Sequence, residues 1–305
     1  MRIIFTGTSD FGIPTLEMLK RGYDLVAVIT QPDKPTGRKK VMTPPPTKVW
    51  ALANDIKVLQ PKKIADSLEE IKSLSPDVMV VAAYGQIIPL NVLNIPKKGS
   101  INLHASLLPK LRGASPIQTA IMNDEKESGV TVMIMDEKLD HGPIISSISI
   151  PIDDSDDYNQ LHNKLSLAGA KILSETLPQW INGSIKGQEQ DHNQATFTKL
   201  LKRDDARIDW TKPAKQIVQK IKALNPEPGA WTTLDKKSVK IINAVEVKTG
   251  KIDLPGKINL EGNDCLVKCG DYSLKLIQVQ IEGKNPISGQ DFLNGLKNPE
   301  TKVFV

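Results

Sequence analysis

The sequence predicts an α/β domain built on a mostly parallel sheet, followed by a small barrel of short strands. In the first half, apolar runs rich in Val and Ile alternate with amphipathic segments, which is typical of parallel sheets covered on both faces. In the second half, short β-rich runs are separated by Gly, Asn and Asp, which is typical of a small barrel. The 305 residues suffice for about two domains.

Five apolar runs in the first half predict strands: Arg2–Gly7, Leu25–Gln31, Asp77–Tyr84, Gly99–Ala105 and Val130–Asp136. The amphipathic segments between them predict helices: Pro14–Lys20, Lys48–Asn54, Ala65–Ser73 and Pro116–Asn123. In such sheets the ligand crevice lies beyond the carboxyl ends of the strands. We therefore expect the chemistry near residues 7–11, from 31 onward, and near 84–86, 104–109 and 136–140.

The second half begins with a helix-like stretch, Tyr158–Ile181, and a polar segment that we interpret as a linker. A further helix is expected over Pro213–Leu224, with Ile217, Ile221 and Leu224 on one face. The predicted barrel strands are Ala230–Leu234, Val239–Val247, Lys257–Leu260, Cys265–Cys269 and Tyr272–Ile281. We place the domains at residues 1–188 and 207–305, with the linker at 189–206.

Composition excludes several classes of protein. With 39% hydrophobic and 25% charged residues, the chain is an ordinary globular sequence. Its longest apolar run, Val78–Tyr84, is far too short to span a membrane, and the N-terminus lacks a secretory apolar segment. Two cysteines, Cys265 and Cys269, cannot form a disulfide framework. We expect a cytoplasmic protein with no membrane partner.

The net charge of +5 is mild, but it is unevenly distributed. Residues 33–48 hold five Lys and Arg against a single Asp, and residues 189–305 hold 19 against 15 Asp and Glu. Two basic regions could contact a polyanion, while a merely solvated surface is an equally good interpretation at this charge. The connection Gln31–Pro46 is unusually long, contains Gly37, and ends on three prolines. A mobile basic loop of this kind is suited to binding a phosphate backbone.

A glycine-containing turn, Gly7–Gly12, follows the first strand. It lacks the third glycine of a dinucleotide-binding fingerprint, and Ile13-Pro14 stands where a phosphate loop has Lys-Ser or Lys-Thr. We therefore favour a turn that packs a helix on a strand over a nucleotide site.

The segment Ser100–Pro109 holds the sharpest local signal. Side chains of an extended strand alternate, so Asn102 and His104 project together on one side. Buried polar groups need partners, which predicts either a local network or a site. An amide can stabilise an oxyanion, and an imidazole can act as acid or base near neutral pH. The turn-rich stretch 105–116 at the strand end favours the site.

Asp140 follows another predicted strand end, ahead of Gly142-Pro143. It is either a carboxylate that orients an imidazole or a turn former, and spacing alone does not place it near His104. No metal site is predicted, because the two cysteines lie four apart in a β-like region and the other histidines lack ligand spacing. Of these, His162 is expected on a helix surface.

Together these motifs resemble the methionyl-tRNA formyltransferase family, over almost the whole chain. The segments that carry the resemblance are Phe5–Phe11, Gln31–Arg38, Asn102–Pro109, Arg112–Pro116, Met135–Gly142, Ala206–Trp210 and Asn225–Trp231. The Asn-x-His-x-Ser-Leu-Leu-Pro segment with a later Leu-Asp is typical of folate-dependent formyltransferases in general. The basic loop and the C-terminal motifs narrow the resemblance to the tRNA enzymes.

The resemblance implies a doubly wound, Rossmann-like catalytic domain and an OB-like, tRNA-binding C-terminal barrel. It implies formyl transfer from 10-formyltetrahydrofolate to the α-amino group of methionyl initiator tRNA, giving N-formylmethionyl-tRNA for translation initiation. No metal is required, because the formyl group arrives activated on the folate. We take a monomer as the default.

By motif, the resemblance implies a catalytic trio of Asn102, His104 and Asp140. The folate-binding turn would comprise Ser106, Leu107, Leu108 and Pro109. The residues that meet the acceptor end of tRNA would be Lys34, Arg38, Lys39 and Lys40. We hypothesise that Asn102 and protonated His104 stabilise the tetrahedral oxyanion, while Asp140 orients His104 and helps remove a proton from the amine.

Two residues depart from the family pattern: His141 stands where Thr is common, and Glu227 replaces a common Trp. The basic loop is also about one residue shorter than usual. The nearest rival function is a transformylase acting on a purine precursor or an amino sugar nucleotide, which needs neither the basic loop nor a tRNA-facing barrel. Two further rivals are a non-catalytic RNA-binding protein and a folate hydrolase or dehydrogenase module. The intact trio argues against the RNA-binding protein, and the lack of a second catalytic domain argues against the hydrolase or dehydrogenase.

Overall fold

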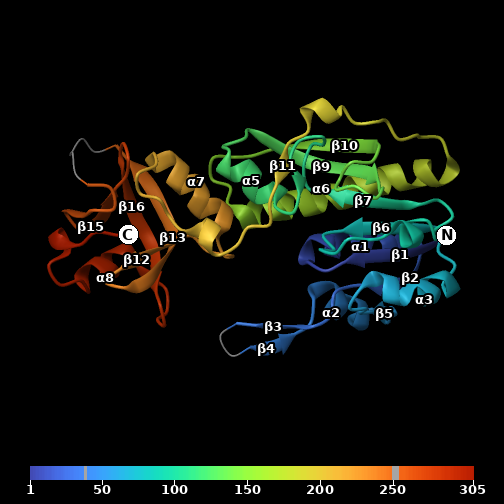
Figure 1. Ribbon diagram of the computed structural model, residues 1–305, viewed down its shortest axis with the longest axis horizontal. Helices are drawn as coiled ribbons and strands as arrows, with labels where there is room; N and C mark the ends of the chain where they lie inside the picture. The colour runs from blue at the N-terminus through green and yellow to red at the C-terminus, as the bar shows by residue number, and fades with distance from the viewer. Residues whose placement is uncertain (38–39, 249–253) are drawn as a thin grey trace. The chain divides into compact units, whose positions relative to one another are not determined.

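In a computed structural model of the chain, the structure describes residues 1–37, 40–248 and 254–305. They form two compact units (Figure 1). The first unit comprises Met1–Pro116, Glu127–Pro151 and Gln160–Lys199. The second unit comprises Ile117–Lys126, Ile152–Asn159 and Leu200–Val305. Two short segments that precede residue 160 thus belong to the second unit.

A seven-stranded sheet forms the centre of the first unit, in the order β10-β9-β7-β6-β1-β2-β5. The strands are β1 (Arg2–Gly7), β2 (Asp24–Ile29), β5 (Val58–Leu59), β6 (Val78–Ala82), β7 (Ser100–His104), β9 (Glu127–Ile134) and β10 (Ile144–Pro151). The five strands from β7 to β5 are parallel, while β9 and β10 are antiparallel additions at one edge. The central strands β6 and β7 are buried along their whole length, as their continuous apolar runs predict.

The strand order confirms the doubly wound arrangement. From β1 the chain moves outward to β2 and β5, then returns to add β6 and β7 on the other side of β1. Right-handed crossovers on opposite sides of a starting strand put their helices on opposite faces of the sheet. The helices of the first unit are α1 (Ile13–Gly22), α2 (Pro46–Ala53), α3 (Leu68–Ser73), α4 (Leu90–Leu93) and most of α6 (Tyr158–Asn182), while all but the first residue of α5 (Pro116–Met122) belongs to the second unit. Within the described residues, no helix is long and apolar enough to cross a membrane.

The glycine turn after β1 has a packing reason. A Cβ atom on Gly7 would lie 2.4 Å from the Ala82 carbonyl oxygen, and one on Gly12 would lie 2.5 Å from Cζ of Phe5. Both glycines therefore let the turn close over the buried Phe5 ring and the end of β6. This geometry agrees with the packing turn that we favour from the sequence.

The second unit contains an antiparallel sheet in the order β12-β13-β16-β15-β14, with β17 added on β16. Its strands are β12 (Trp231–Leu234), β13 (Lys237–Val247), β14 (Ile258–Glu261), β15 (Asp264–Lys268), β16 (Ser273–Ile281) and β17 (Ile287–Ser288), and its helices are α7 (Ala214–Leu224) and α8 (Gly289–Asn294). Ile217, Ile221 and Leu224 of α7 are all buried, as predicted. The sheet is curled, as expected for an OB-like barrel.

The C-terminal residues hydrogen-bond to both edges of this sheet. Thr233 of β12 and Val305 exchange two backbone hydrogen bonds of 2.9 Å. Near β14, the Ile258 amide donates to the Lys302 carbonyl at 3.0 Å, and the Phe304 amide donates to the Gly256 carbonyl at 2.8 Å. The chain end thus bridges strands that would otherwise present open edges.

Several segments differ from the sequence expectation, three of them with a bearing on the site or on a named residue. The loop Gln31–Pro46 contains a hairpin of β3 (Lys34–Thr36) and β4 (Val41–Thr43). The segment expected to be a linker contributes β11 (Phe197–Thr198), which pairs in parallel with β8 (Arg112–Gly113). The prediction that His162 lies on a helix surface is wrong. It is buried, with its ring 5.6 Å from that of Phe11 and Nε2 3.4 Å from an Asp10 carboxylate oxygen.

Candidate active site

The carboxyl end of β7 presents the two polar side chains that the sequence places on one side of this strand. Asn102 and His104 are 9% and 6% exposed. Among the described residues, nothing hydrogen-bonds to the Asn102 side chain, so its amide is available to a ligand. A nearly buried amide of this kind can donate to an oxygen that gains negative charge.

Asp140 lies beside His104, a contact that sequence spacing does not predict. One carboxylate oxygen, Oδ2, is 3.5 Å from Nδ1 of His104 and accepts a 2.8 Å hydrogen bond from the Gly113 amide. On the other side of the ring, His104 Nε2 donates to the Leu111 carbonyl at 2.9 Å. Both ring nitrogens thus face acceptors, an arrangement that suits an imidazolium. We call Asn102, His104 and Asp140 the β7-end site.

The turn Ser106–Pro109 directly follows β7 and is held by Thr131 of β9. The Thr131 hydroxyl donates to the Ser106 carbonyl at 2.7 Å and accepts from the Leu108 amide at 3.1 Å. The Ser106 hydroxyl donates to the Lys110 carbonyl at 2.6 Å. These hydrogen bonds fix the turn at the strand end, so its shape does not depend on side-chain packing alone.

The carboxyl end of the neighbouring strand β6 adds an exposed apolar side chain. Ile87 is 88% exposed, which is unusual for isoleucine. The preceding Tyr84 anchors this segment, because its carbonyl accepts from Thr8 at 2.8 Å and from Gln31 at 2.7 Å. Burial raises the pKa of Tyr84 to about 12. The strand-end rule draws attention to residues 84–86 but not to Ile87, whose only signal in the sequence is an Ile-Ile pair a few residues after a strand.

The structure describes two of the four residues of the predicted basic cluster. Lys34 and Lys40 are exposed, and Lys34 donates to the Gln31 side chain, whereas Arg38 and Lys39 lie outside the described residues. Lys48, counted among the basic residues of this stretch, pairs with Asp33 at 2.8 Å. Hydrogen bonds from Gln60 and Lys48 lower the pKa of Asp33. The positive charge of Lys48 is therefore paired with the carboxylate of Asp33.

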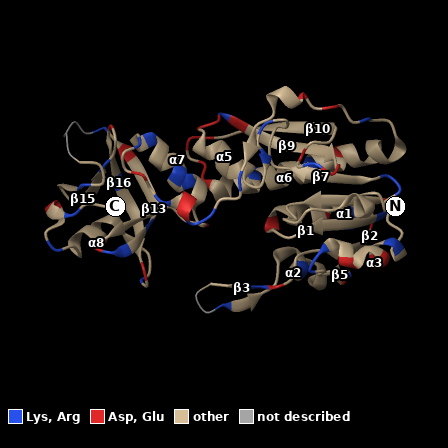
Figure 2. Ribbon diagram, viewed as in Figure 1, with Lys and Arg blue, Asp and Glu red and all other residues tan. Residues whose placement is uncertain are grey.

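The second unit carries a basic and aromatic cluster near the start of β12. The guanidinium carbons of Arg203 and Arg207 lie 5.3 and 5.7 Å from the centre of the Trp231 ring, and both arginines are exposed. The Trp231 indole donates to the Arg203 carbonyl at 2.8 Å. Lysines also lie along α7 (Figure 2). Stacked guanidinium groups keep their outer edges available for phosphate.

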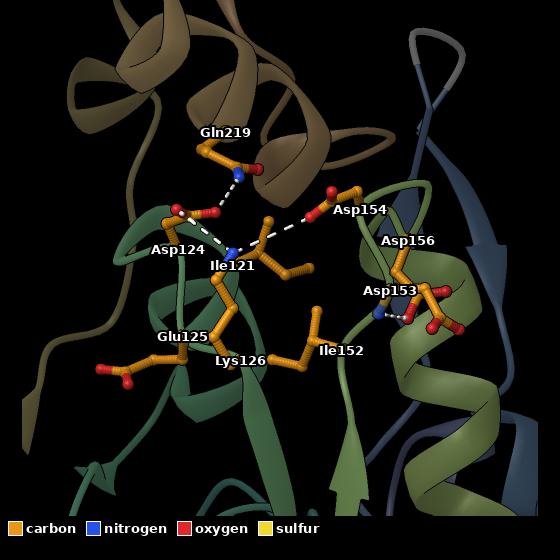
Figure 3. Close-up of a pocket in the computed structure, with 9 residues that line it drawn as sticks. All are labelled: Ile121, Asp124, Glu125, Lys126, Ile152, Asp153, Asp154, Asp156 and Gln219. Atoms are coloured by element: carbon orange, nitrogen blue, oxygen red, sulfur yellow. Dashed lines mark hydrogen bonds and ion pairs between the residues drawn. The ribbon is translucent and has the colours of Figure 1, made fainter.

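A pocket in the second unit contains none of the predicted site residues. Several of its acidic side chains are paired within the pocket or with α7 (Figure 3). Asp124 accepts from Gln219 at 2.7 Å and forms ion pairs with Lys126 at 3.6 Å and with Lys215. Lys126 also lies 3.8 Å from Asp154. We call these five residues the Asp124 cluster. Its pairing of charges indicates a structural tie within the second unit.

Two family models match the chain. The formyl transferase model matches residues 1–177, and the model of the formyl transferase C-terminal domain matches residues 200–297. A methionyl-tRNA formyltransferase of Bacillus velezensis is 47% identical over 299 residues, which cover 96% of this chain and 94% of the relative. One of Halalkalibacterium halodurans is also 47% identical, over 97% of this chain and 95% of the relative.

The chain belongs to the methionyl-tRNA formyltransferase family. It is an enzyme of the formyl transferase class.

More distant solved structures share the fold. WlaRD, a sugar 3N-formyl transferase, superposes with a TM-score of 0.66 at 22% identity, over 93% of this chain and 99% of its own. Methionyl-tRNA formyltransferase from Clostridium thermocellum gives a TM-score of 0.58 at 18% identity, over 82% and 95%. HypX from Aquifex aeolicus gives 0.68 at 18% identity, over 97% of this chain but 48% of its own.

The departure from the family pattern at position 141 has a local explanation. His141 Nδ1 donates to Asp136 at 2.7 Å, and its ring stacks on His192 with centres 4.0 Å apart. His141 thus links Asp136, which lies just after β9, to His192, which lies in the segment after α6. It belongs to a histidine pair that no spacing in the sequence predicts.

Proposed function

We propose that the protein transfers the formyl group of 10-formyltetrahydrofolate to the α-amino group of methionyl initiator tRNA, giving N-formylmethionyl-tRNA. The contact between His104 and Asp140 beside Asn102 is the observation that carries this proposal. Residues 1–188 would form the catalytic domain and residues 207–305 the tRNA-binding domain, joined by residues 189–206. We further propose that the protein works in the cytoplasm as a monomer.

The proposed chemistry needs an oxyanion stabiliser and a route for protons. The amine nitrogen bonds to the formyl carbon, and the bond from that carbon to N10 of the folate breaks. The Asn102 amide and the His104 imidazolium would stabilise the tetrahedral oxyanion between these events. Asp140 would hold the imidazolium and take the amine proton through a water, and this proton would pass on to N10 as the folate leaves.

No metal is required in this scheme. The formyl carbon arrives bound to a nitrogen that leaves as a neutral amine, so a Lewis acid is not needed to activate it. Preincubation with a chelator is expected to leave formyl transfer unchanged. Loss of activity that returns with an added divalent cation would contradict this part of the proposal.

The folate would bind at the ends of β6 and β7. The turn Ser106–Pro109 is held by Thr131, and the exposed Ile87 offers an apolar surface at the adjacent strand end. An apolar surface beside fixed backbone groups suits a flat heterocycle. WlaRD and HypX, which share the fold, have been crystallised with folates.

The tRNA would meet two basic regions. Lys34, Arg38, Lys39 and Lys40 lie in the stretch 31–46 of the sequence, and Arg203 and Arg207 flank Trp231 in the second unit. Phosphate contacts of this kind weaken with salt, so the affinity for tRNA is expected to fall as salt rises. The affinity for folate should respond far less.

One assay separates the candidate functions. The protein is given 10-formyltetrahydrofolate with a labelled formyl group, and four acceptors are compared: methionyl initiator tRNA, methionyl elongator tRNA, glycinamide ribonucleotide and an amino sugar nucleotide. We expect label on the methionyl initiator tRNA. Label on the ribonucleotide or the sugar alone would replace the proposal with the rival transformylase, to which the fold is equally suited.

A further inference from the structure

Gln190 lies in the segment expected to be a linker, yet it is one of the most fully bonded side chains near the β7-end site. It is 6% exposed. Its amide nitrogen donates to two backbone carbonyls, at 3.0 Å to Asp140 and at 2.7 Å to Gly142. Its amide oxygen accepts from Arg112, at 3.2 Å from Nε and 2.6 Å from Nη2. Every strong donor and acceptor direction of the side chain is thus used.

Arg112 fixes Gln190 from the side of the loop that follows β7. Arg112 is 3% exposed, and its guanidinium also donates to His192 Nδ1 at 2.9 Å. The Arg112 backbone amide donates to the Thr196 carbonyl at 2.9 Å. These hydrogen bonds hold the segment that carries Gln190 against β8.

Asp140 needs such a support. Its φ of +46° lies in the left-handed region, which is unfavourable for residues other than glycine. Gly142, two residues further on, cannot carry a side chain, since a Cβ would lie 2.0 Å from the Ile134 carbonyl oxygen. The two hydrogen bonds from Gln190 hold the carbonyls on either side of His141. On the carboxylate side, the Gly113 amide holds Oδ2 toward His104.

We propose that Gln190 is a positioning residue for formyl transfer, whose side-chain NH2 group fixes the backbone of Asp140 and thereby its contact with His104. This inference rests on the proposed function, in which Asp140 acts on His104. Gln190 acts through Asp140 and touches no reacting atom. The segment after α6 thereby completes the site in addition to connecting two domains.

Two variants of Gln190 and one control test whether the amide nitrogen of its side chain is the group that matters. Gln190→Glu keeps an acceptor for Arg112 but replaces the NH2 donor with an oxygen that faces two carbonyl oxygens. Gln190→Ala removes both ends. Gln194→Ala is the matched control, because Gln194 lies on the same segment, is exposed, and bonds only to Asp191 among the described residues.

The decisive experiment is a double-mutant cycle with Asp140→Ala, measured as kcat for formyl transfer to methionyl initiator tRNA. In the wild-type background, Gln190→Glu and Gln190→Ala are expected to lower kcat by about 30-fold while both KM values change less than about twofold. In the Asp140→Ala background, Gln190→Glu should lower kcat no further. The pH profile of kcat for Gln190→Glu should move toward that of Asp140→Asn. Gln194→Ala should match the wild type throughout.

Other outcomes overturn the inference. A loss of kcat that is equal in both backgrounds would make Gln190 a general structural residue, and wild-type kinetics for Gln190→Glu would remove the donor role. If the wild-type protein formylates a different acceptor, the proposed function fails and the cycle is measured with that acceptor. The NMR signal of the Gly113 amide gives a readout that needs no activity. It should shift in Gln190→Glu and stay in place in Gln194→Ala, and an unchanged signal in both variants contradicts the proposal.

Discussion

The β7-end site and the Asp124 cluster both gather charged side chains, but they differ in burial. At the β7-end site the side chains of His104 and Asp140 are 6% and 14% exposed. In the Asp124 cluster, Lys126, Asp154 and Lys215 are 72%, 98% and 61% exposed, and Asp124 itself is 29% exposed. Water screens the charges of the Asp124 cluster, whereas His104 and Asp140 interact with little screening.

The two regions also differ in the use of their hydrogen bonds. In the Asp124 cluster, lysines neutralise the carboxylates: Lys215 lowers the pKa of Asp124, and Asp124 raises the pKa of Lys215. At the β7-end site, backbone groups hold the side chains and leave the Asn102 amide without a partner among the described residues. Removing a side chain of the β7-end site should therefore lower the rate of formyl transfer. Removing one from the Asp124 cluster should change that rate little.

The largest effect is expected for His104→Ala. The variant loses the proposed oxyanion stabiliser, so kcat for formyl transfer should fall by about 10³-fold. Steady-state kinetics with both substrates checks this, and KM for the tRNA should change less than about threefold. A kcat within about tenfold of the wild type would place the chemistry elsewhere.

A smaller effect on binding is expected for the double variant Arg203→Ala/Arg207→Ala. Because these guanidinium groups would contact phosphates, KM for the tRNA should rise by about tenfold and its dependence on salt should become less steep. KM for the folate should not change. The control for loss of positive charge alone is Lys236→Ala, which removes an exposed lysine elsewhere in the second unit. An equal rise in KM for both substrates would contradict a role in tRNA binding.

The buried thiols of the second unit predict a loss of stability at alkaline pH. Burial raises the pKa values of Cys265 and Cys269 from 9.0 to about 12, so both stay protonated in the folded protein at a pH where the unfolded chain ionises. The unfolded state then binds fewer protons, and the free energy of unfolding falls as pH rises above 9. At pH 10 the loss should be about 1 kcal/mol per thiol, measured by urea unfolding.

The double variant Cys265→Ala/Cys269→Ala serves as the reference for this measurement. Its free energy of unfolding should fall less between pH 8 and pH 10 than that of the wild type, since the thiols no longer contribute and the raised pKa values of Tyr23 and Tyr84 remain. In the native wild type, iodoacetamide should modify neither thiol at neutral pH. Rapid modification of a folded sample would show that the thiols are accessible.

The smallest effect is expected for Asp124→Asn. The variant loses screened ion pairs, so the melting temperature at pH 7 should fall by no more than about 3 °C, and kcat should stay unchanged. Because the pKa of Asp124 is lowered, its contribution is present above the ordinary value of 3.8 and disappears as pH falls through the lowered value. A large loss of kcat would show that the Asp124 cluster has a role in the reaction.

Much of the fold was predictable because strand periodicity is local. The continuous apolar run at residues 78–84 predicts a buried central strand, and β6 is buried along its length. The same rule places Asn102 and His104 on one side of β7, where the structure has them buried. The hairpin β3–β4 and the edge strand β10 are missed, because their side chains are largely exposed or alternate with serine.

By itself, the sequence determined most of the segments that form strands and helices, that His104 lies at a strand end, and which family the chain resembles. Only the tertiary structure decided that Asp140 contacts His104, that Gln190 supports Asp140, and that Val305 pairs with Thr233. These pairs are 36, 50 and 72 residues apart in the sequence. Patterns repeating every two or four residues carry no information on such contacts, which depend on strand order and on the course of the connecting loops.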